Sequence, residues 1–169
     1  MTDPNDLVEC LAGLHFGSIN DTVAVAIGRE AGPICLPYGI PGPRGFGQRH
    51  VEEHPSRMMH IQRFGFSTFV SYTHFICQQY DWITDGHHGR LVLVRSKDGY
   101  DHTVVVQYDE PQGHWAITTG LPKRVHRGDR LWERVQAGRS EPSPGDVEKR
   151  PRRETLTLPN LSNLDGNRS

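Results

Sequence analysis

Three β-branched runs separated by two tight turns constrain the fold of this chain more than any other feature of its sequence. The runs cover residues 91–95, 102–108 and 114–119. The first turn contains Asp98-Gly99 and the second contains Pro111-Gln112-Gly113. Asp-Gly and Gly-containing turns between β-branched runs are typical of β-hairpins. The sequence therefore predicts an antiparallel meander of three or more strands.

The residues before the meander predict helices and short strands. Apolar residues recur at helical spacing over 66–80 and again over 7–14, where Asp3 or Asn5 could be the N-cap. The short apolar runs 23–27 and 33–36 are bounded by Gly and Pro, so each is interpreted as a strand. Helices first and a meander afterwards predict an α+β domain, with N-terminal helices packed on a C-terminal antiparallel sheet. We expect this domain to cover 23–136, with a helical extension over 1–22.

The end of the chain differs in composition from the predicted domain. Residues 137–169 are rich in Pro, Arg, Ser and Gly and lack apolar periodicity, which predicts a mostly disordered tail. Within it, residues 156–158 could add an edge strand or dock on a partner. The basic cluster 149–153 could contact phosphates, but a solvated run of charges is the simpler interpretation.

Charge and cysteine content limit the function classes. The net charge of −1 predicts no general attraction to nucleic acids or membranes, so any basic patch must be local. Cys10, Cys35 and Cys77 are widely spaced and form no CxxC pair, which argues against a zinc knuckle or a disulfide framework and favours a reducing compartment. There is no long apolar run and no signal-peptide pattern at the start. We therefore expect a cytoplasmic protein, or one delivered into a target cell by another route, with no membrane partner.

His50 and His54 are the first candidates for chemistry. They follow the Gly- and Pro-rich segment 37–47, which predicts a loop, and their spacing would place them on one face of a helix. One interpretation is a zinc hydrolase, because His50-x-x-Glu53-His54 spells the inverted zinc-peptidase motif. Pro55 ends such a helix at once and no third ligand is evident downstream, so this is the least favoured alternative. The others are acid–base catalysis and a pair of structural histidines.

The predicted sheet supplies further polar residues near its strand ends. Thr118 and Thr119 lie on the last strand, where alternation predicts that they face opposite sides. His102 begins the middle strand, and Arg90 and Lys123 flank the outer strands. Cleavage of RNA needs a group to deprotonate the 2′-OH, one to protonate the leaving oxygen and a donor for the phosphate, but no metal or other cofactor. Each residue alone has a plainer interpretation: strand threonines, solvated cations and an exposed histidine.

A resemblance to a known family connects these residues. It is carried by the segment 27–36, the Gly47-Gln48-Arg49-His50-Val51-Glu52-Glu53-His54 helix, the strand segments 89–95 and 102–106, and Trp115-Ala116-Ile117-Thr118-Thr119-Gly120. In this order they resemble the phage and polymorphic-toxin branch of the barnase/EndoU/colicin-nuclease/RelE superfamily of metal-independent RNases. The resemblance covers roughly 100 residues, a plausible size for one domain.

The resemblance implies an endoribonuclease, of toxin or phage-effector type, that cuts RNA by 2′-OH transesterification. His50 or His54 would be the acid or base, Thr118 or Thr119 would bind the scissile phosphate, and Arg90, His102 or Lys123 would supply positive charge. Arg49, beside His50, is a further candidate for substrate binding. RNA would be the substrate, and an immunity or inhibitor protein a possible partner. The main alternative is a non-catalytic, phage-encoded binding or inhibitor protein on the same fold, which the near-neutral charge favours because RNA-cutting domains are often basic.

Overall fold

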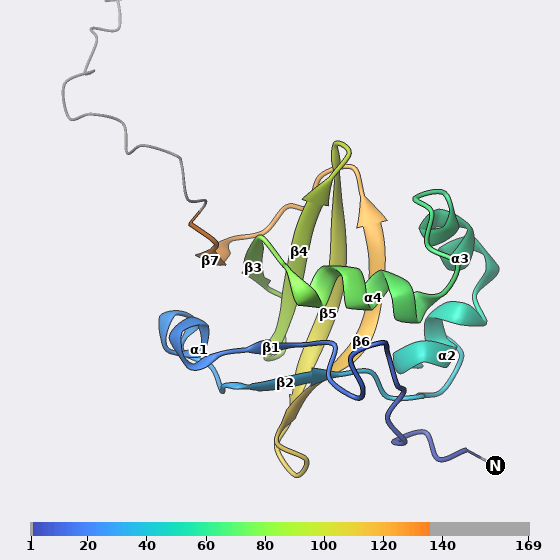
Figure 1. The fold of residues 1–169 in the computed structure, drawn as a ribbon, viewed down its shortest axis with the longest axis horizontal. Helices are drawn as coiled ribbons and strands as arrows, with labels where there is room; N and C mark the ends of the chain where they lie inside the picture. The colour runs from blue at the N-terminus through green and yellow to red at the C-terminus, as the bar shows by residue number, and fades with distance from the viewer. Residues whose placement is uncertain (1, 136–169) are drawn as a thin grey trace, which may run out of the picture. The chain divides into compact units, whose positions relative to one another are not determined.

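The computed structural model describes residues 2–135, which form a curled, seven-stranded mixed sheet and four short helices (Figure 1). The strands are β1 (Gly17–Ile19), β2 (Gly32–Cys35), β3 (Trp82–Asp85), β4 (Arg90–Lys97), β5 (Tyr100–Asp109), β6 (His114–Lys123) and β7 (Arg130–Glu133). Their order in the sheet is β1-β2-β6-β5-β4-β3-β7. The helices are α1 (Asp21–Ile27), α2 (Gly47–Glu52), α3 (Pro55–Gln62) and α4 (Phe69–Gln78). The predicted tail 137–169, with its segments 149–153 and 156–158, lies outside the described residues.

The centre of the sheet is the meander β4-β5-β6, and the three β-branched runs lie within these strands. Asp98 (φ 53°) and Gly99 (φ 76°) form the two-residue turn between β4 and β5. Positive φ at both positions is what a type I′ hairpin turn requires, and its twist matches that of the flanking strands. The local turn chemistry therefore sets the register of the uninterrupted β4–β5 ladder.

The predicted arrangement of N-terminal helices packed on a C-terminal meander is wrong. Strands dominate, and the N-terminal half contributes β1 and β2 to the same sheet, where β2 pairs with β6 in parallel and every other neighbouring pair is antiparallel. β3 and β7 extend the opposite edge. Sheet membership of this kind depends on pairings between residues far apart in sequence, which local periodicity does not encode.

Two local predictions in the N-terminal part are also wrong. The run 23–27 lies in α1 rather than in a strand, because Asn20 caps the helix by accepting from the Val23 backbone NH at 2.9 Å and Gly28 ends it in the left-handed conformation. The helix predicted over 7–14 is absent. There, the Val8 NH donates to the Leu36 carbonyl at 2.8 Å, so this segment is held by the chain beyond β2.

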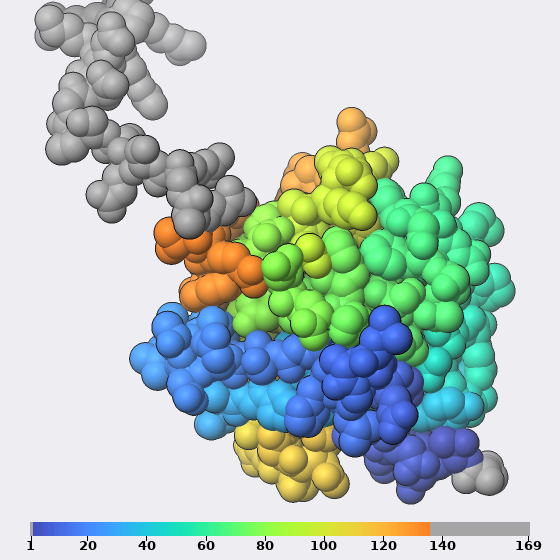
Figure 2. All heavy atoms as spheres, in the orientation of Figure 1, coloured from blue at the N-terminus to red at the C-terminus, as the bar shows by residue number. Residues whose placement is uncertain are grey.

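The helix predicted over 66–80 is confirmed in shorter form as α4, which begins with a capping box at Thr68 and Ser71. It packs across β4 and β5, where Tyr72 and Ile76 are completely buried (Figure 1). The N-terminal segment lies across the same face of the molecule as α4 (Figure 2). Burial of each large apolar side chain contributes roughly 1.5–3 kcal/mol, so this layer is the main core.

α2 and α3 pack beside β6 rather than over the centre of the sheet (Figure 1). α2 ends at Glu52, and His54 is the N-cap residue of α3, with Pro55 at its first position. The proline therefore separates two helices and His50 and His54 do not share a helix face. Within residues 2–135, no helix combines the length and apolar character needed to cross a membrane.

Candidate functional site

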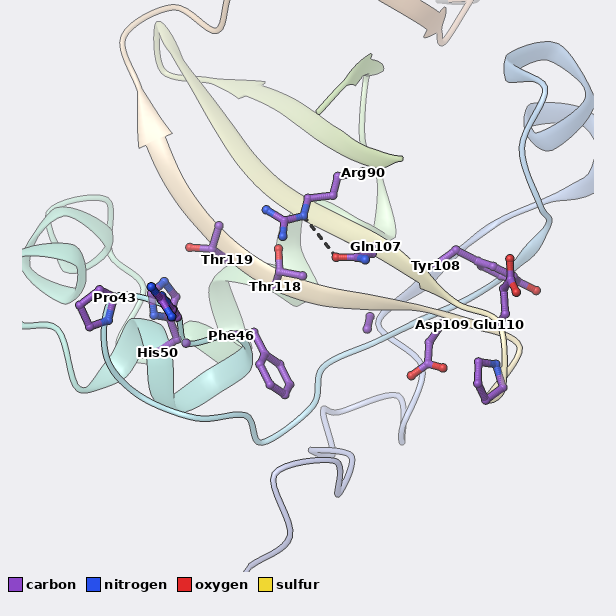
Figure 3. A pocket seen from close by; sticks show the side chains of 14 residues that line it. Pro43, Phe46, His50, Arg90, Gln107, Tyr108, Asp109, Glu110, Thr118 and Thr119 are labelled. Atoms are coloured by element: carbon purple, nitrogen blue, oxygen red, sulfur yellow. Dashed lines mark hydrogen bonds between the residues drawn. The ribbon is translucent and has the colours of Figure 1, made fainter. Parts of the chain in front are cut away.

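A cavity of about 840 Å³ lies between α2, the loop before it, and strands β4 to β6 (Figure 3). Its polar lining includes His50, Arg90, Gln107, Thr118 and Thr119. Figure 3 places His50 at one end of the cavity and Asp109 and Glu110 at the other. The cavity thus collects four of the residues that the sequence singled out: His50, Arg90, Thr118 and Thr119.

The loop 37–47 is ordered and positions the histidine end of the cavity. Its Ile40 and Phe46 backbones exchange two hydrogen bonds of 3.1 Å, and a Cβ at Gly45 would collide with the Ile40 carbonyl oxygen. This tight closure brings the Gly42 carbonyl to His50, eight residues further along the chain. The predicted loop is confirmed, and its glycines permit the close backbone approach.

His50 is 9% exposed, and both of its ring nitrogens have partners. Nδ1 lies 2.9 Å from the Gly42 carbonyl oxygen, and Nε2 lies 2.9 Å from Nη1 of Arg57. A carbonyl only accepts and a guanidinium only donates, so Nδ1 carries the hydrogen and Nε2 is unprotonated. Burial, and then the charge of Arg57, lower the pKa of His50 below its ordinary value of 6.5. The imidazole is therefore held neutral, with its lone pair on Nε2.

Arg57, on α3, is the functional residue that sequence reasoning missed. Its Nη1 also donates to Thr119 Oγ1 at 2.7 Å, so one guanidinium joins α2, α3 and β6. Arg57 forms no ion pair with a carboxylate within residues 2–135. A part-buried guanidinium whose side-chain partners are neutral is suited to an anion such as phosphate. Seven residues separate it from His50, but Pro55 lies between them, so no helical spacing could have revealed the pair.

Thr118 and Thr119 both line the cavity, contrary to the expectation that they face opposite sides. Val105 is paired with Thr119 and Val106 with Ile117, which leaves Thr118 as the extra residue of a β-bulge. A bulge interrupts the alternation of side chains and redirects them, and bulges are over-represented beside active sites.

The two threonine hydroxyls have different roles in hydrogen bonding. Thr118 Oγ1 donates to the Val105 carbonyl at 3.2 Å, so its hydrogen is engaged. Thr119 Oγ1 accepts from Arg57, and its own hydrogen has no acceptor within residues 2–135, so it can donate into the cavity. Thr119 is therefore the better donor to an anion.

Arg90, together with Arg44, brings positive charge to the cavity lining. It faces Gln107 across the β4–β5 pair, and its Nε donates to Gln107 Oε1 at 3.2 Å (Figure 3). Phe46 adds aromatic surface to the lining, whereas the ring of Tyr108, another lining residue, packs against the buried Trp115 with centroids 5.2 Å apart. Cationic and hydroxyl groups near His50, with an aromatic ring beside them, match the needs of a phosphodiester that carries bases.

His102 does not belong to this site. It is 1% exposed and shares its side of β5 with the buried Val104 and Val106, whereas Gln107 points to the other side, into the cavity. The rings of Phe64, Phe66, Tyr72 and Phe75 surround it, with centroids 5.0–6.0 Å away. Within residues 2–135 neither ring nitrogen has a hydrogen-bond partner of good geometry, and burial lowers the pKa of His102. It is a core residue rather than the exposed strand-start residue that its position suggested.

Three other candidates lie outside the cavity. His54 is exposed, and its Nδ1 is 3.1 Å from Ser56 Oγ. Arg49 pairs with Glu53 instead of facing the cavity, and Lys123 is exposed at the far end of β6. For the zinc alternative, the part of the chain from 2 to 135 contains no group of three or more His, Cys, Asp or Glu side chains placed to hold a metal ion.

Comparisons of this chain with protein-family models, with curated proteins and with solved structures give no match.

Proposed function

We propose that this chain is a metal-independent endoribonuclease, of toxin or phage-effector type, that cleaves RNA by 2′-OH transesterification in the cavity beside α2. The observation that carries the proposal is the contact of one guanidinium, Arg57, with both His50 Nε2 and Thr119 Oγ1. There, a neutral imidazole and a hydroxyl donor that line the cavity both contact a cation, Arg57, which is not itself a lining residue. These are the groups needed at a phosphate that undergoes attack by a neighbouring hydroxyl.

His50 is the base in this mechanism. Its Nε2 takes the proton from the ribose 2′-OH, and the 2′-oxygen forms a bond to the adjacent phosphorus. Arg57, Arg90 and the hydroxyl of Thr119 stabilise the charge on the non-bridging oxygens. The bond from phosphorus to the 5′-oxygen breaks, and that oxygen takes a proton from water, which the exposed rim at Arg90 admits. The products are a 2′,3′-cyclic phosphate and a free 5′-hydroxyl.

The decisive experiment incubates a labelled RNA with the full chain in EDTA. We expect products ending in 2′,3′-cyclic phosphate, and no cleavage of a substrate with 2′-deoxyribose at every position. His50→Ala should lower the rate by about 10²–10⁴-fold, the usual contribution of a general base. His54→Ala is the matched control, because His54 is exposed and outside the cavity, and should keep the wild-type rate. Equal rates in wild type and His50→Ala would refute the assignment.

A second candidate is a non-catalytic binding or inhibitor protein that uses the same cavity. It is favoured by the net charge of −1 and by Asp109 and Glu110 in the cavity lining, because carboxylates repel a polyanion. This candidate predicts no cleavage by the wild type and capture of a defined protein partner that is lost on substitution of cavity residues. A ribonuclease of this type would instead be blocked by an immunity or inhibitor protein that covers the cavity.

A further inference from the structure

The contact between Arg57 and His50 has a consequence for how the site works. In the tautomer that the Gly42 carbonyl selects, Nε2 is the only position at which His50 can take a proton. That position already accepts a hydrogen bond from Arg57 at 2.9 Å. The lone pair needed for catalysis is therefore occupied, and Arg57 must leave it before His50 can act as a base.

The hydrogen-bonding partners of Arg57 make it ready to leave. Neighbouring Arg49 is paired with a carboxylate, Glu53, whereas Arg57 donates to a neutral imidazole and a neutral hydroxyl. A guanidinium gains both a hydrogen bond and the attraction of opposite charges from an anion, but only a hydrogen bond from a neutral group, so phosphate is the stronger partner. A phosphate in the cavity that accepts from the Thr119 hydroxyl would lie beside the atom that Arg57 already contacts. It would therefore compete with His50 for the guanidinium.

We propose that Arg57, besides contacting the substrate phosphate, holds His50 inactive until a phosphate group binds, draws the guanidinium away from Nε2 and so frees the lone pair for the 2′-OH. The ligand class is a phosphate mono- or diester. The proposal deepens the proposed function, since the freed lone pair is the one assigned to the base. Coupling base activation to phosphate binding would keep the imidazole unavailable in the absence of substrate.

The charges around His50 determine the sign of the expected change. Arg57 and His54 both disfavour the imidazolium, and the cavity lining adds Arg44 and Arg90 as cations and Asp109 and Glu110 as anions at the far end. A bound phosphate offsets the charge of Arg57 and removes its hydrogen bond to Nε2. Both changes favour protonation, so phosphate should raise the pKa of His50.

Titration of the full chain by NMR, with the His50 ring signal assigned by its loss in His50→Ala, tests the proposal without any RNA. Inorganic phosphate is the probe, against potassium chloride at equal ionic strength. We expect phosphate to move the His50 titration midpoint upward in the wild type. In Arg57→Ala the midpoint should already be higher and should not respond to phosphate. Arg49→Ala is the matched control, since Arg49 lies outside the cavity, and should respond like the wild type.

A wild-type midpoint unchanged by phosphate, or an equal response in Arg57→Ala, would overturn the proposal. If Arg57→Ala does not fold, Arg57→Gln tests the same point, because it keeps a donor for Thr119 without the charge and should also be unresponsive. The two proposals fail separately. If phosphate does not move the His50 midpoint of the wild type although the wild type cleaves RNA, only the role of Arg57 is rejected. If phosphate moves the midpoint as expected but the protein cuts no RNA, the ribonuclease is rejected.

Discussion

His50 and His102 are 9% and 1% exposed, and burial is the largest cause of the lowered pKa of each. Their surroundings are otherwise opposite. His50 lines a cavity and both its nitrogens have partners, whereas His102 lies under α4 among four aromatic rings, and neither of its nitrogens has a partner of good geometry in the described part of the chain. Burial and a shifted pKa therefore do not identify a functional histidine by themselves. What distinguishes His50 is that it lines a cavity and that each of its ring nitrogens has a partner with a fixed donor or acceptor role.

The largest expected difference between the two histidines is in the rate of RNA cleavage when each is replaced by leucine. His50→Leu should lower the rate of RNA cleavage by about 10²–10⁴-fold, because it removes the base. His102→Leu should leave the rate within about two-fold of wild type, since its side chain reaches no substrate and Leu suits an apolar site. Initial rates on one RNA in EDTA, beside the unfolding midpoint of each variant in urea, provide the measurement. A comparable loss of activity in a well-folded His102→Leu protein would contradict this division.

The next largest expected difference is in kcat, between valine variants of the two cavity threonines. Thr119→Val removes a free donor and should lower kcat by roughly 10²–10³-fold, as the loss of one transition-state donor does. Thr118→Val removes a hydroxyl whose hydrogen is already bonded to the Val105 carbonyl, and should lower kcat by less than about ten-fold. Valine preserves the shape of threonine in both variants, so each controls for the other. Equal losses would show that the hydrogen-bond assignment at the bulge is wrong.

Replacement of His102 should instead change how the free energy of unfolding depends on pH. Burial lowers the pKa of His102 in the folded protein below its ordinary value of 6.5. As the pH falls, the unfolded chain therefore binds a proton at this residue before the folded protein does. Its contribution to stability is complete above pH 6.5 and is lost as the pH falls below that value. His102→Leu should flatten the acid side of the curve by up to about 1.4 kcal/mol per pH unit. His126 and His50 also have lowered pKa values, so some slope should remain.

Urea unfolding at a series of pH values from 7.5 to 5 measures this effect. His60→Leu, at an exposed position of α3, is the control for the change from histidine to leucine itself. Parallel curves for wild type and His102→Leu would mean that His102 is not buried in its neutral form.

The smallest effects should come from the two basic residues that the sequence suggested and the fold placed outside the cavity. Arg49→Ala and Lys123→Ala should each change the rate of RNA cleavage by less than about two-fold and leave the unfolding midpoint in urea close to that of the wild type. Arg90→Ala is the contrasting variant, because Arg90 lines the cavity, and it should raise KM for RNA. A raised KM in Lys123→Ala would extend the binding surface along β6 beyond the cavity.

Much of the site could not be predicted, and the particular residues explain why. Thr118 and Thr119 share one cavity only because of a bulge whose position depends on the pairing of β5 with β6. Arg57 reaches His50 only because the chain turns at Pro55 and α3 packs beside β6. His54, four residues from His50, looked like its natural companion, yet the same turn directs it to solvent.

The sequence by itself determined the meander, through turn residues such as Asp98-Gly99 that need positive φ, and the helix α4, through apolar spacing and its Thr68 cap. It also singled out His50 and the two threonines. Only the tertiary structure decided that β1 and β2 join the sheet, that His102 faces the core, and that Arg57 completes the site. The physical reason is that backbone preferences act between near neighbours, whereas strand pairing, burial and the approach of side chains depend on segments that meet only when the chain folds.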